Sequence, residues 1–200
     1  MKADTAQAKQ AVRDEMLAIR RALSREARDC MTAALTERIV SLPAFRNAQR
    51  IMAYLAMPGE ADVDAVIEQA LALGKEVYVP CILKGPERLM EAGRLRDMHH
   101  FCRGPLGLRA LPEGYEAAAP DDLDLVLVPA VACDRQGRRI GMGAGYYDRY
   151  LTGVKRERRT AVIWDFQVAG AIPSDRFDQR VSLIVTEKAD FVRRGGVNFE

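Results

Sequence analysis

The sequence lacks a long apolar run, a paired-cysteine motif and a strong excess of one charge. No stretch of about 18 apolar residues occurs, so a membrane-spanning helix is not expected. Cys30, Cys81, Cys102 and Cys133 lie far apart and form no Cys-x-x-Cys pair, which argues against a zinc ribbon and against a disulfide scaffold. A net charge of +2, from 30 basic and 28 acidic residues, gives no case for a nucleic-acid partner.

The remaining features of the sequence do not suggest export, metal binding or a polyanionic partner. The amino terminus, MKADTAQAKQ, has no apolar core of the kind found in signal peptides, so together with the dispersed cysteines it predicts a soluble cytoplasmic protein. His99 and His100 are adjacent, and neighbouring residues of a strand point to opposite faces, so a metal site with Cys102 is not expected. The basic stretch VKRERR at 154–159 is interpreted as a solvated helix end or loop.

A length of 200 residues and an ordinary composition predict one globular domain over 1–200. Residues 1–42 have the apolar spacing of two amphipathic helices packed on the remainder of the chain. Ser24 is a plausible N-cap of the second helix, and the proline in SLPAF ends that helix. The inner faces are expected to be Val12, Met16, Ile19 and Leu23 in the first helix, and Ala27, Met31, Leu35 and Ile39 in the second.

Beyond the two helices, short apolar segments alternate with helical ones. A helix is expected at 61–74 and another opening near Gly145, with strands at 50–56, 75–83, 122–133, 161–166 and 181–187. This alternation predicts an α/β fold: a mainly parallel twisted sheet with helices on both faces, in a three-layer, Rossmann-like arrangement. The Gly-, Pro- and Glu-rich segment 84–120 is expected to be irregular, with edge strands at 88–92 and 94–98. Ligands of such sheets bind at the carboxyl ends of the strands.

A glycine-rich stretch, RRIGMGAGYYDRYL at 138–151, is the clearest candidate for a site. It has no Lys-Ser or Lys-Thr of a standard phosphate loop, and no glycine at 146 to complete Gly-x-Gly-x-x-Gly. A loop that opens into a helix nevertheless presents backbone N–H groups and a positive dipole end to an anion, and Arg138 and Arg139 precede it. Asp148 could hold Mg²⁺ against phosphate oxygens, while Tyr146 and Tyr147 offer ring faces and hydroxyls. The alternative is a glycine-rich turn with buried tyrosines.

The segment LVLVPAVACDRQGRRIGMGAGYYDRYL at 125–151 resembles the signature of the 5-formyltetrahydrofolate cyclo-ligase family, also called 5,10-methenyltetrahydrofolate synthetases. That signature reads approximately V-P-G-x-x-F-D-x-x-G-x-R-L-G-x-G-G-G-Y-Y-D-R-x-L. Three further segments are similar to parts of the family: KQAVR at 9–13, YLAMPGEADV at 54–63 and IPSDRFDQRVSLIVTE at 172–187. The resemblance therefore spans nearly the whole chain.

This resemblance implies an ATP- and Mg²⁺-dependent ring closure. The formyl oxygen of 5-formyltetrahydrofolate attacks the γ-phosphate of ATP to give a phosphorylated imidate, and the bridge nitrogen of the folate then attacks the activated carbon. Loss of phosphate leaves 5,10-methenyltetrahydrofolate, with ADP as the other product. No enzyme nucleophile is required, so catalysis rests on alignment of the substrates and on electrostatic stabilisation of the transferring phosphoryl group. ATP is the implied co-substrate and Mg²⁺ the implied cofactor; a monomer without nucleic-acid or membrane partners is expected.

Carried over position by position, the resemblance assigns a role to residues of each matching segment. Asp148 and Asp178 bind Mg²⁺, directly or through water. The catalytic candidates are Arg139, Tyr146 and Tyr147. Folate contacts are expected from Leu55, Glu60, Met142, Gly143, Ala144, Gly145 and Tyr146. The ATP cradle is expected from Lys9, Arg13, Arg139, Ile140, Gly141, Met142, Gly143, Ala144, Gly145, Tyr146 and Tyr147.

Without the resemblance, the same residues have ordinary structural interpretations. Lys9 and Arg13 are four residues apart, hence on one face of the first helix, where exposed basic residues are common. Glu60 lies near the amino end of the helix expected at 61–74, where an acid complements the helix dipole. Asp178 has the alternative of a turn residue after Pro173.

The chain departs from the family signature at several positions. Ala144 and Ala130 replace glycines, Cys133 replaces an aromatic residue, and Phe177 and Ser182 stand where many members have His and Asp. An alanine costs roughly 1 kcal/mol where φ must be positive, so only a modest local change is expected at 144.

Two other functional classes stay open from the residues alone. One is a folate- or nucleotide-binding module without turnover, against which the retained Asp148 argues, because binding alone does not need a metal carboxylate. The other is a sugar-phosphate isomerase or regulator domain, for which an acid–base pair and a helix-turn-helix segment are lacking.

Overall fold

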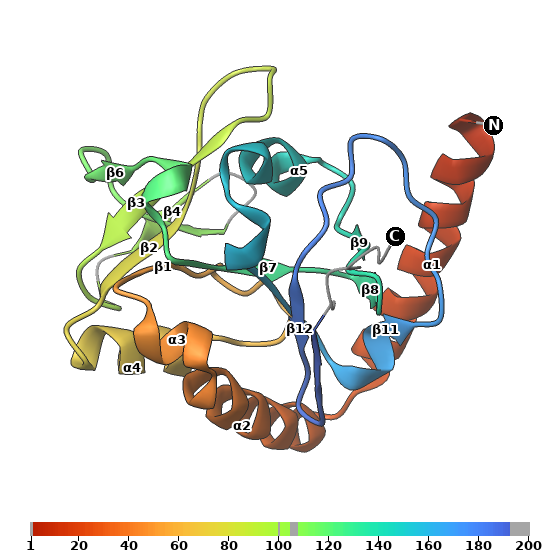
Figure 1. The fold of residues 1–200 in the computed structure, drawn as a ribbon, viewed down its shortest axis with the longest axis horizontal. Helices are drawn as coiled ribbons and strands as arrows, with labels where there is room; N and C mark the ends of the chain where they lie inside the picture. Colours follow the sequence, from red (N-terminus) through yellow and green to blue (C-terminus); the bar gives the residue numbers. More distant parts are fainter. Residues whose placement is uncertain (1, 100, 105–107, 193–200) are drawn as a thin grey trace, which may run out of the picture.

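The computed structural model describes residues 2–99, 101–104 and 108–192, so His100 lies outside the described residues. The α-helices in Figure 1 are α1 (Lys2–Ala22), α2 (Arg25–Ser41), α3 (Pro43–Asn47), α4 (Asp64–Ala72) and α5 (Tyr146–Tyr150). Short 3₁₀ turns are η2 (Pro120–Asp122), η3 (Leu151–Gly153), η4 (Arg156–Arg158) and η5 (Asp165–Gln167). The strands are β1 (Arg50–Met52), β2 (Glu76–Ile82), β3 (Met90–Leu95), β4 (Cys102–Arg103), β5 (Arg109–Ala110), β6 (Ala117–Ala118), β7 (Leu125–Pro129), β8 (Ala132–Asp134), β9 (Arg139–Ile140), β10 (Arg159–Val162), β11 (Val168–Ala169), β12 (Leu183–Val185) and β13 (Asp190–Val192).

An eight-stranded sheet, in the order β13-β12-β10-β7-β1-β2-β3-β6, runs through the described part of the chain. The central strands β12, β10, β7, β1 and β2 are parallel, whereas β13 at one end and β3 and β6 at the other are antiparallel. A separate small sheet has the order β11-β8-β9, and β4 pairs with β5. The predicted α/β fold with a mainly parallel sheet is confirmed.

Alternate side chains of the central strands are buried on opposite faces of the large sheet. In β7, Leu125 and Leu127 pack with α2, α3 and α4, while Val126 and Val128 pack with α5 and the turn after it. Burial on both faces explains why this strand reads as a continuous apolar run rather than as an alternating pattern. Figure 1 shows the resulting three layers, with α2, α3 and α4 on one side of the sheet and α5 on the other.

Local sequence signals explain where α2 and α3 begin. Ser24 Oγ accepts a hydrogen bond from the backbone N–H of Ala27 at 3.1 Å, as its predicted place at the N-cap requires. Pro43 lies in the first turn of α3, where a missing backbone N–H breaks no intrahelical bond. Leu35 and Ile39 are fully buried, which confirms the predicted inner face of α2 at these positions.

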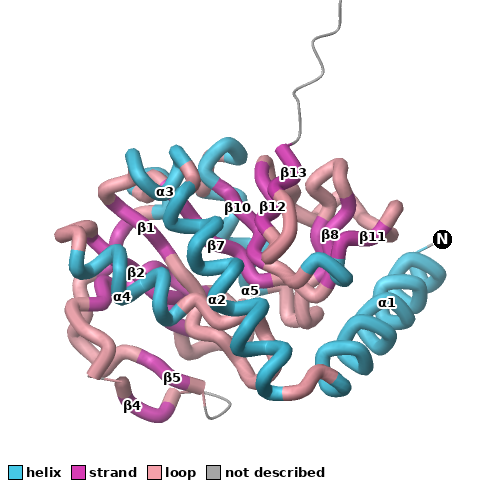
Figure 2. Tube along the Cα trace, turned by 90° about the horizontal axis from the view of Figure 1, so that it is seen from below, coloured by secondary structure: helices cyan, strands magenta, loops and turns pink. Residues whose placement is uncertain are grey.

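The first helix lies at one end of the molecule, beside β8 and β11 (Figure 2). Met16 is buried against the small sheet, with Val12 and Leu17 packed around it. Ile19, expected on the inner face, is instead 38% exposed. Because α1 flanks the end of the sheet and does not lie across one of its faces, only a narrow apolar stripe of the helix is covered.

The structure corrects three of the expected strands. The strand expected at 122–133 is divided: β7 ends at Pro129, and β8, in the small sheet, begins at Ala132. Proline has no N–H to donate, so it terminates the ladder that β7 forms with β10. The two edge strands expected at 88–92 and 94–98 are one strand, β3, which is covered on its outer side by β6. The other expected strands are present but shorter, and Asp165–Gln167 at the end of 161–166 forms η5.

A buried aspartate builds the turn between β8 and β9. The carboxylate of Asp134, which is fully buried, accepts hydrogen bonds from the backbone N–H groups of Gln136 and Arg138, both at 3.0 Å. The Arg138 guanidinium also pairs with Asp134, at 3.4 Å, so Arg138 is committed to the turn although it adjoins the glycine run in sequence. The turn fixes where β9, and with it Arg139, begins.

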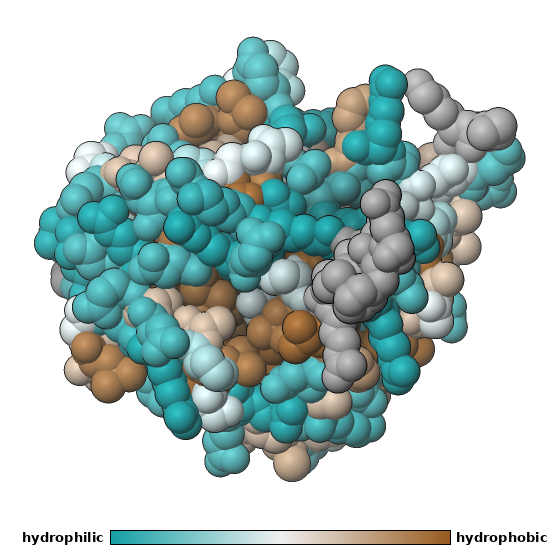
Figure 3. Space-filling view, viewed as in Figure 1, coloured by the Kyte–Doolittle hydropathy of each residue, from teal (hydrophilic) through white to brown (hydrophobic). Residues whose placement is uncertain are grey.

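The surface of the protein is mainly polar (Figure 3), while the apolar side chains of the sheet and helices lie in the core. Figure 3 shows mainly hydrophilic side chains over the face seen in Figure 1, with hydrophobic side chains gathered in a hollow near its middle. No helix among the described residues is long and apolar enough to cross a membrane.

Replacing Gly137 with alanine is expected to destabilise the protein by about 1–3 kcal/mol. Gly137 has φ +75°. An added Cβ would collide with the carbonyl oxygen of Val181. The backbone N–H of Val181 also donates a hydrogen bond to the carbonyl oxygen of Gly137, at 2.9 Å. Urea unfolding of Gly137→Ala should show the loss, whereas Gly170→Ala, with nothing within 4 Å of its Cβ, should match the wild type. Equal midpoints for both variants would contradict this assignment.

Candidate functional site

The glycine run connects β9 to α5, as the sequence predicts. Ile140 is buried at the end of β9, whereas Met142, Gly143 and Ala144 are exposed on the loop, and Gly145 is the N-cap of α5. Gly143 has φ +99°, a value that a residue with a Cβ adopts only with strain, but the φ of Ala144 is not positive. The alanine at 144 therefore causes no backbone strain, although the family signature has glycine there.

Arg139 lies beneath this loop in a buried ion pair. Its Nη2 is 2.6 Å from Asp148 Oδ1 and its Nη1 is 3.4 Å from the carbonyl oxygen of Pro129, while the residue is only 4% exposed. The guanidinium also lies over the ring of Tyr147, 5.9 Å from its centroid. Arg139 Nε is buried and has no hydrogen-bond partner among the described residues. The arginine thus has one unused donor while its charge is held by Asp148.

Arg13 of α1 lies against the outer side of the same loop. Its Nε donates a hydrogen bond to the carbonyl oxygen of Gly141 at 2.8 Å, and Gln10 Oε1 accepts another from its Nη1 at 3.2 Å. Its Cζ would lie 3.6 Å from a Cβ built on Gly143. The predicted neighbours in the ATP cradle, Arg13 and the glycine run, are therefore in contact.

Lys9, one turn earlier in α1, is held by two carboxylates. Its Nζ is 2.8 Å from Asp175 Oδ2 and 2.7 and 2.6 Å from the two oxygens of Asp178. Lys9 is 8% exposed, and although its burial lowers the pKa, the hydrogen bonds and charges of both aspartates raise it overall above the ordinary lysine value. Lys9 is therefore a fixed, charged group at this end of the site.

Arg20 of α1 reaches a third loop, between β1 and α4. Its Nε donates to the carbonyl oxygen of Gly59 at 2.7 Å, and its Nη2 is 3.8 Å from Glu60 Oε1. The Glu60 carboxylate also accepts a hydrogen bond from Met57 N at 3.1 Å, and only 8% of its side chain is exposed. Burial raises the pKa of Glu60, while the Met57 N–H and Arg20 oppose that shift.

One stripe of α1 thus contacts three loops that are far apart in the sequence. Lys9, Arg13 and Arg20 are separated by four and seven residues, which places them on one face of a helix. Lys9 and Arg13 are among the predicted site residues, whereas Arg20 is not, because its spacing gives the shared face but not the contact with Glu60. Asp175 is not among them either, and one sequence offers no signal for it because its partner, Lys9, is 166 positions away.

Aromatic side chains lie between the glycine run and Glu60. The hydroxyl of Tyr147 is buried without a hydrogen-bond partner among the described residues, and the indole Nε1 of Trp164 is in the same state. Burial, reinforced by the nearby Glu60, raises the pKa of Tyr147, so its hydroxyl is a proton donor and not a base. Leu55 is half-buried in the same core cluster as Trp164. The hydroxyl of Tyr147 and the indole N–H of Trp164 are thus buried donors without partners among the described residues.

The two carboxylates predicted to hold Mg²⁺ lie on neighbouring segments. Asp148 Oδ1 accepts a hydrogen bond from Gln179 N at 3.3 Å, and Gln179 follows Asp178 directly. Both bonds to Asp148 among the described residues fall on Oδ1, which leaves Oδ2 as a possible ligand atom. Among the described residues no three His, Cys, Asp or Glu side chains are grouped as a metal site, so any Mg²⁺ here would share its ligands with phosphate oxygens or water.

Three of the departures from the family signature lie away from these contacts. Phe177 is 64% exposed on the loop that carries Asp178. Ser182 Oγ donates to the carbonyl oxygens of Arg159 and Glu157, at 3.0 and 3.2 Å. Cys133 is fully buried, and burial raises the pKa of its thiol to about 12, in keeping with the structural role expected for it.

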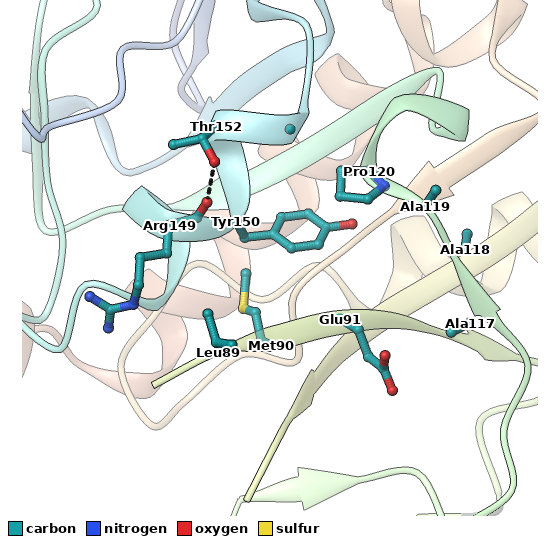
Figure 4. A pocket seen from close by; sticks show the side chains of 11 residues that line it. Leu89, Met90, Glu91, Ala117, Ala118, Ala119, Pro120, Arg149, Tyr150 and Thr152 are labelled. Atoms are coloured by element: carbon teal, nitrogen blue, oxygen red, sulfur yellow. Dashed lines mark hydrogen bonds between the residues drawn. The ribbon is translucent and has the colours of Figure 1, made fainter. Parts of the chain in front are cut away.

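A separate hollow of about 480 Å³ lies on the other side of α5 (Figure 4). It is lined by Leu89, Met90, Pro120, Tyr150 and Thr152 among others, none of which carries a predicted role. Figure 4 shows the ring of Tyr150 lying across this hollow, between Met90 and Pro120. No residue with a predicted role lines this hollow, so the candidate site is the region beneath α1.

Comparison with known proteins agrees with the motif and with the fold. The model of the "5-formyltetrahydrofolate cyclo-ligase family" matches residues 5–187. A probable 5-formyltetrahydrofolate cyclo-ligase of Caenorhabditis elegans is 30% identical over 179 residues, which are 82% of this chain and 85% of that protein. The 5-formyltetrahydrofolate cyclo-ligase of Mus musculus is 28% identical over 191 residues, 90% of this chain and 94% of the other.

Solved structures give the same result. The Aquifex aeolicus 5,10-methenyltetrahydrofolate synthetase superposes with a TM-score of 0.84 at 32% identity, covering 96% of each chain. The Mycoplasma pneumoniae 5,10-methenyltetrahydrofolate synthetase, at 22% identity and a TM-score of 0.72, shares the fold; 90% of this chain and 98% of the other are covered.

Fold and site together define an α/β protein with a basic helix and a glycine-rich loop at one edge of a mainly parallel sheet. The chain belongs to the 5-formyltetrahydrofolate cyclo-ligase family. The family and the enzyme class inferred from the sequence are therefore confirmed.

Replacing Glu60 with glutamine is expected to change how stability depends on pH. A carboxyl group whose pKa is higher in the folded chain than in the unfolded chain lowers stability as the pH rises through those two values. Burial raises the pKa of Glu60 in this way, so Glu60→Gln should gain stability relative to the wild type as the pH rises from about 4 to about 7.

Urea midpoints measured across this pH range test the expectation. Asp175→Asn is the opposing control, because the hydrogen bond from Lys9 lowers the pKa of Asp175. That variant should lose stability relative to the wild type as the pH rises toward about 4, because a lowered pKa moves the stability change below the ordinary aspartate value, so midpoints are also measured below pH 4. A trend of the same sign in both variants would contradict the raised pKa of Glu60.

Proposed function

We propose that this chain catalyses the ATP- and Mg²⁺-dependent cyclisation of 5-formyltetrahydrofolate to 5,10-methenyltetrahydrofolate, with release of ADP and phosphate. The observation that carries the proposal is the convergence of Lys9 and Arg13 with the glycine run and the Arg139–Asp148 pair, in a chain of this family. Donors for a polyphosphate, carboxylates for its metal ion and a partly apolar region are thereby adjacent.

The triphosphate of ATP would lie along the glycine run. Arg13 holds the loop through Gly141 and its guanidinium faces Gly143, so a phosphate at the loop would meet backbone N–H groups and a fixed cation. Arg139 has an unpartnered Nε directly beneath. Lys9 adds a second fixed charge at the adjacent loop. This arrangement favours a ligand with several negative charges over one with a single charge.

Asp148 and Asp178 are the residues proposed to hold Mg²⁺. The donor set suits this ion, which prefers carboxylate and phosphate oxygens and keeps several waters. When bound, Mg²⁺ would reduce the negative charge of the phosphates toward which the formyl oxygen must move. The chain's own contribution is to place the two carboxylates beside the glycine run, with Arg139 and Lys9 limiting their repulsion.

The folate is proposed to lie between Glu60 and the glycine run. Glu60 is fixed by Met57 and Arg20, so its carboxylate can accept hydrogen bonds from a pterin ring in a defined direction. Tyr147, whose hydroxyl is buried and protonated, can donate to an oxygen of the reacting group. Leu55 and Met142 supply apolar contacts from the two sides. No side chain needs to act as a nucleophile, because the formyl oxygen itself attacks the phosphate.

A folate- or nucleotide-binding module without turnover is the rival function. Its ligands would occupy the same contacts, so only turnover separates the two. Asp148 beside the glycine run favours the enzyme, because binding alone does not need a carboxylate placed to hold a metal ion.

Incubation of the purified protein with 5-formyltetrahydrofolate, ATP and Mg²⁺ is expected to produce the near-ultraviolet absorbance of the methenyl product. The same mixture without ATP, and one containing EDTA, should stay flat. No absorbance change, with 5-formyltetrahydrofolate still binding in titration calorimetry, would favour the binding module.

Replacing Gly143 with valine is expected to weaken ATP binding about tenfold or more and to cost about 1–3 kcal/mol of stability through backbone strain, with the protein still folded. The loop position is exposed, so no core contact is lost, but φ +99° is strained for a side chain and the valine would displace the backbone that faces the phosphates. Calorimetric titration with Mg·ATP measures the effect, and Gly170→Val at an open position is the control. Wild-type affinity in Gly143→Val would show that this loop does not hold the triphosphate.

A further inference from the structure

Lys9 and Asp178, which are proposed to bind different ligands, bind each other in this structure. Both carboxylate oxygens of Asp178 lie within 2.7 Å of Lys9 Nζ, and only 14% of that aspartate's side chain is exposed. A carboxylate held in this way has little capacity left for a metal ion, and a lysine held in this way has little left for a phosphate. Binding of Mg·ATP at the proposed site therefore requires an exchange of partners.

Asp175 is the third member of this group and has no assigned role. Its Oδ2 is 2.8 Å from Lys9 Nζ, and 47% of its side chain is exposed. The backbone ties it to the same loop, because Asp178 Oδ2 accepts a hydrogen bond from Asp175 N at 2.7 Å and Asp175 Oδ1 accepts one from Phe177 N at 2.8 Å. If Asp178 turns to a metal ion, Asp175 is the carboxylate that remains on Lys9.

We infer that Asp175 is a counter-ion that competes with the nucleotide phosphates for Lys9 and so lowers the affinity of this chain for ATP. The inference rests on the proposed function, because it assumes that the phosphates meet Lys9. A carboxylate 2.8 Å from the ammonium group cancels most of the charge that a phosphate would meet. Its exposure makes the displacement feasible, because the released carboxylate can be solvated by water.

The test is calorimetric titration of the folate-free protein with Mg·ATP at low and at high salt. Asp175→Asn keeps the size of the side chain, and its one amide oxygen can still accept the hydrogen bond from Phe177 N, but the charge and the acceptor that faces Lys9 are removed. This variant is expected to bind Mg·ATP about three- to tenfold more tightly than the wild type at low salt, and this gain should shrink at about 1 M NaCl because salt screens the exposed charge. Asp175→Glu, which keeps the charge, should bind like the wild type.

A matched control removes a comparable charge elsewhere. Glu116 is 53% exposed and is paired with Arg94 and Arg96, on the antiparallel side of the sheet. Glu116→Gln should leave the affinity for Mg·ATP unchanged. Thermal unfolding of all variants without nucleotide establishes that each is folded at the temperature of titration.

Two results would overturn the inference, and they are distinguishable. If the wild type binds Mg·ATP and Asp175→Asn binds it equally or more weakly, Asp175 is no competitor, although the proposed function stands. If neither protein binds Mg·ATP, the proposed function fails and the inference fails with it.

Discussion

Three basic side chains of one helix hold together the loops from which the candidate site is made. Lys9, Arg13 and Arg20 each contact a different loop, and the three loops are far apart in the sequence. The helix has only a narrow apolar stripe, centred on Met16, to attach it to the small sheet. Its position therefore depends to an unusual degree on polar contacts, and the site depends on its position. A shift of α1 would separate Arg13 from the glycine run and Arg20 from Gly59 and Glu60.

Three of the basic side chains at this edge lie beside carboxylates. Arg139 is paired with Asp148, Lys9 with Asp175 and Asp178, and Arg20 lies beside Glu60. A buried charge without a partner is strongly unfavourable, so a site for a polyphosphate and its metal ion can be kept folded only if its cations and carboxylates neutralise each other when it is empty. Ligand binding therefore has to break some of these ion pairs. Residues such as Asp175, which hold the pairs, then affect the affinity for Mg·ATP.

Several buried polar atoms lack partners among the described residues, and two of them, the hydroxyl of Tyr147 and Nε of Arg139, lie where the folate and the phosphates are proposed to bind. The hydroxyl of Tyr147, the indole N–H of Trp164 and Nε of Arg139 are of this kind among the described residues. Leaving such donors unpaired reduces stability, and the buried carboxyl of Glu60, with its raised pKa, does the same at neutral pH. A ligand that satisfied the donors at the proposed site would recover this loss on binding.

The sequence alone determined the class of fold. It also identified the glycine run and, through the resemblance to a family signature, the site residues within that run. Continuous apolar segments predict buried parallel strands because strands covered on both faces have no polar side, and β7 is such a strand. The predicted boundaries of the strands were less accurate. Pro129 divides one expected strand into β7 and β8, and β3 replaces two expected edge strands. Pairing across the sheet decides where a strand ends, and the sequence does not show that pairing. Only the tertiary structure showed that Arg20 belongs with Lys9 and Arg13, that Asp148 is held by Arg139, and that Asp175 shares Lys9 with Asp178. These contacts join side chains that are up to 169 positions apart, and local patterns carry no information on pairs at such separations.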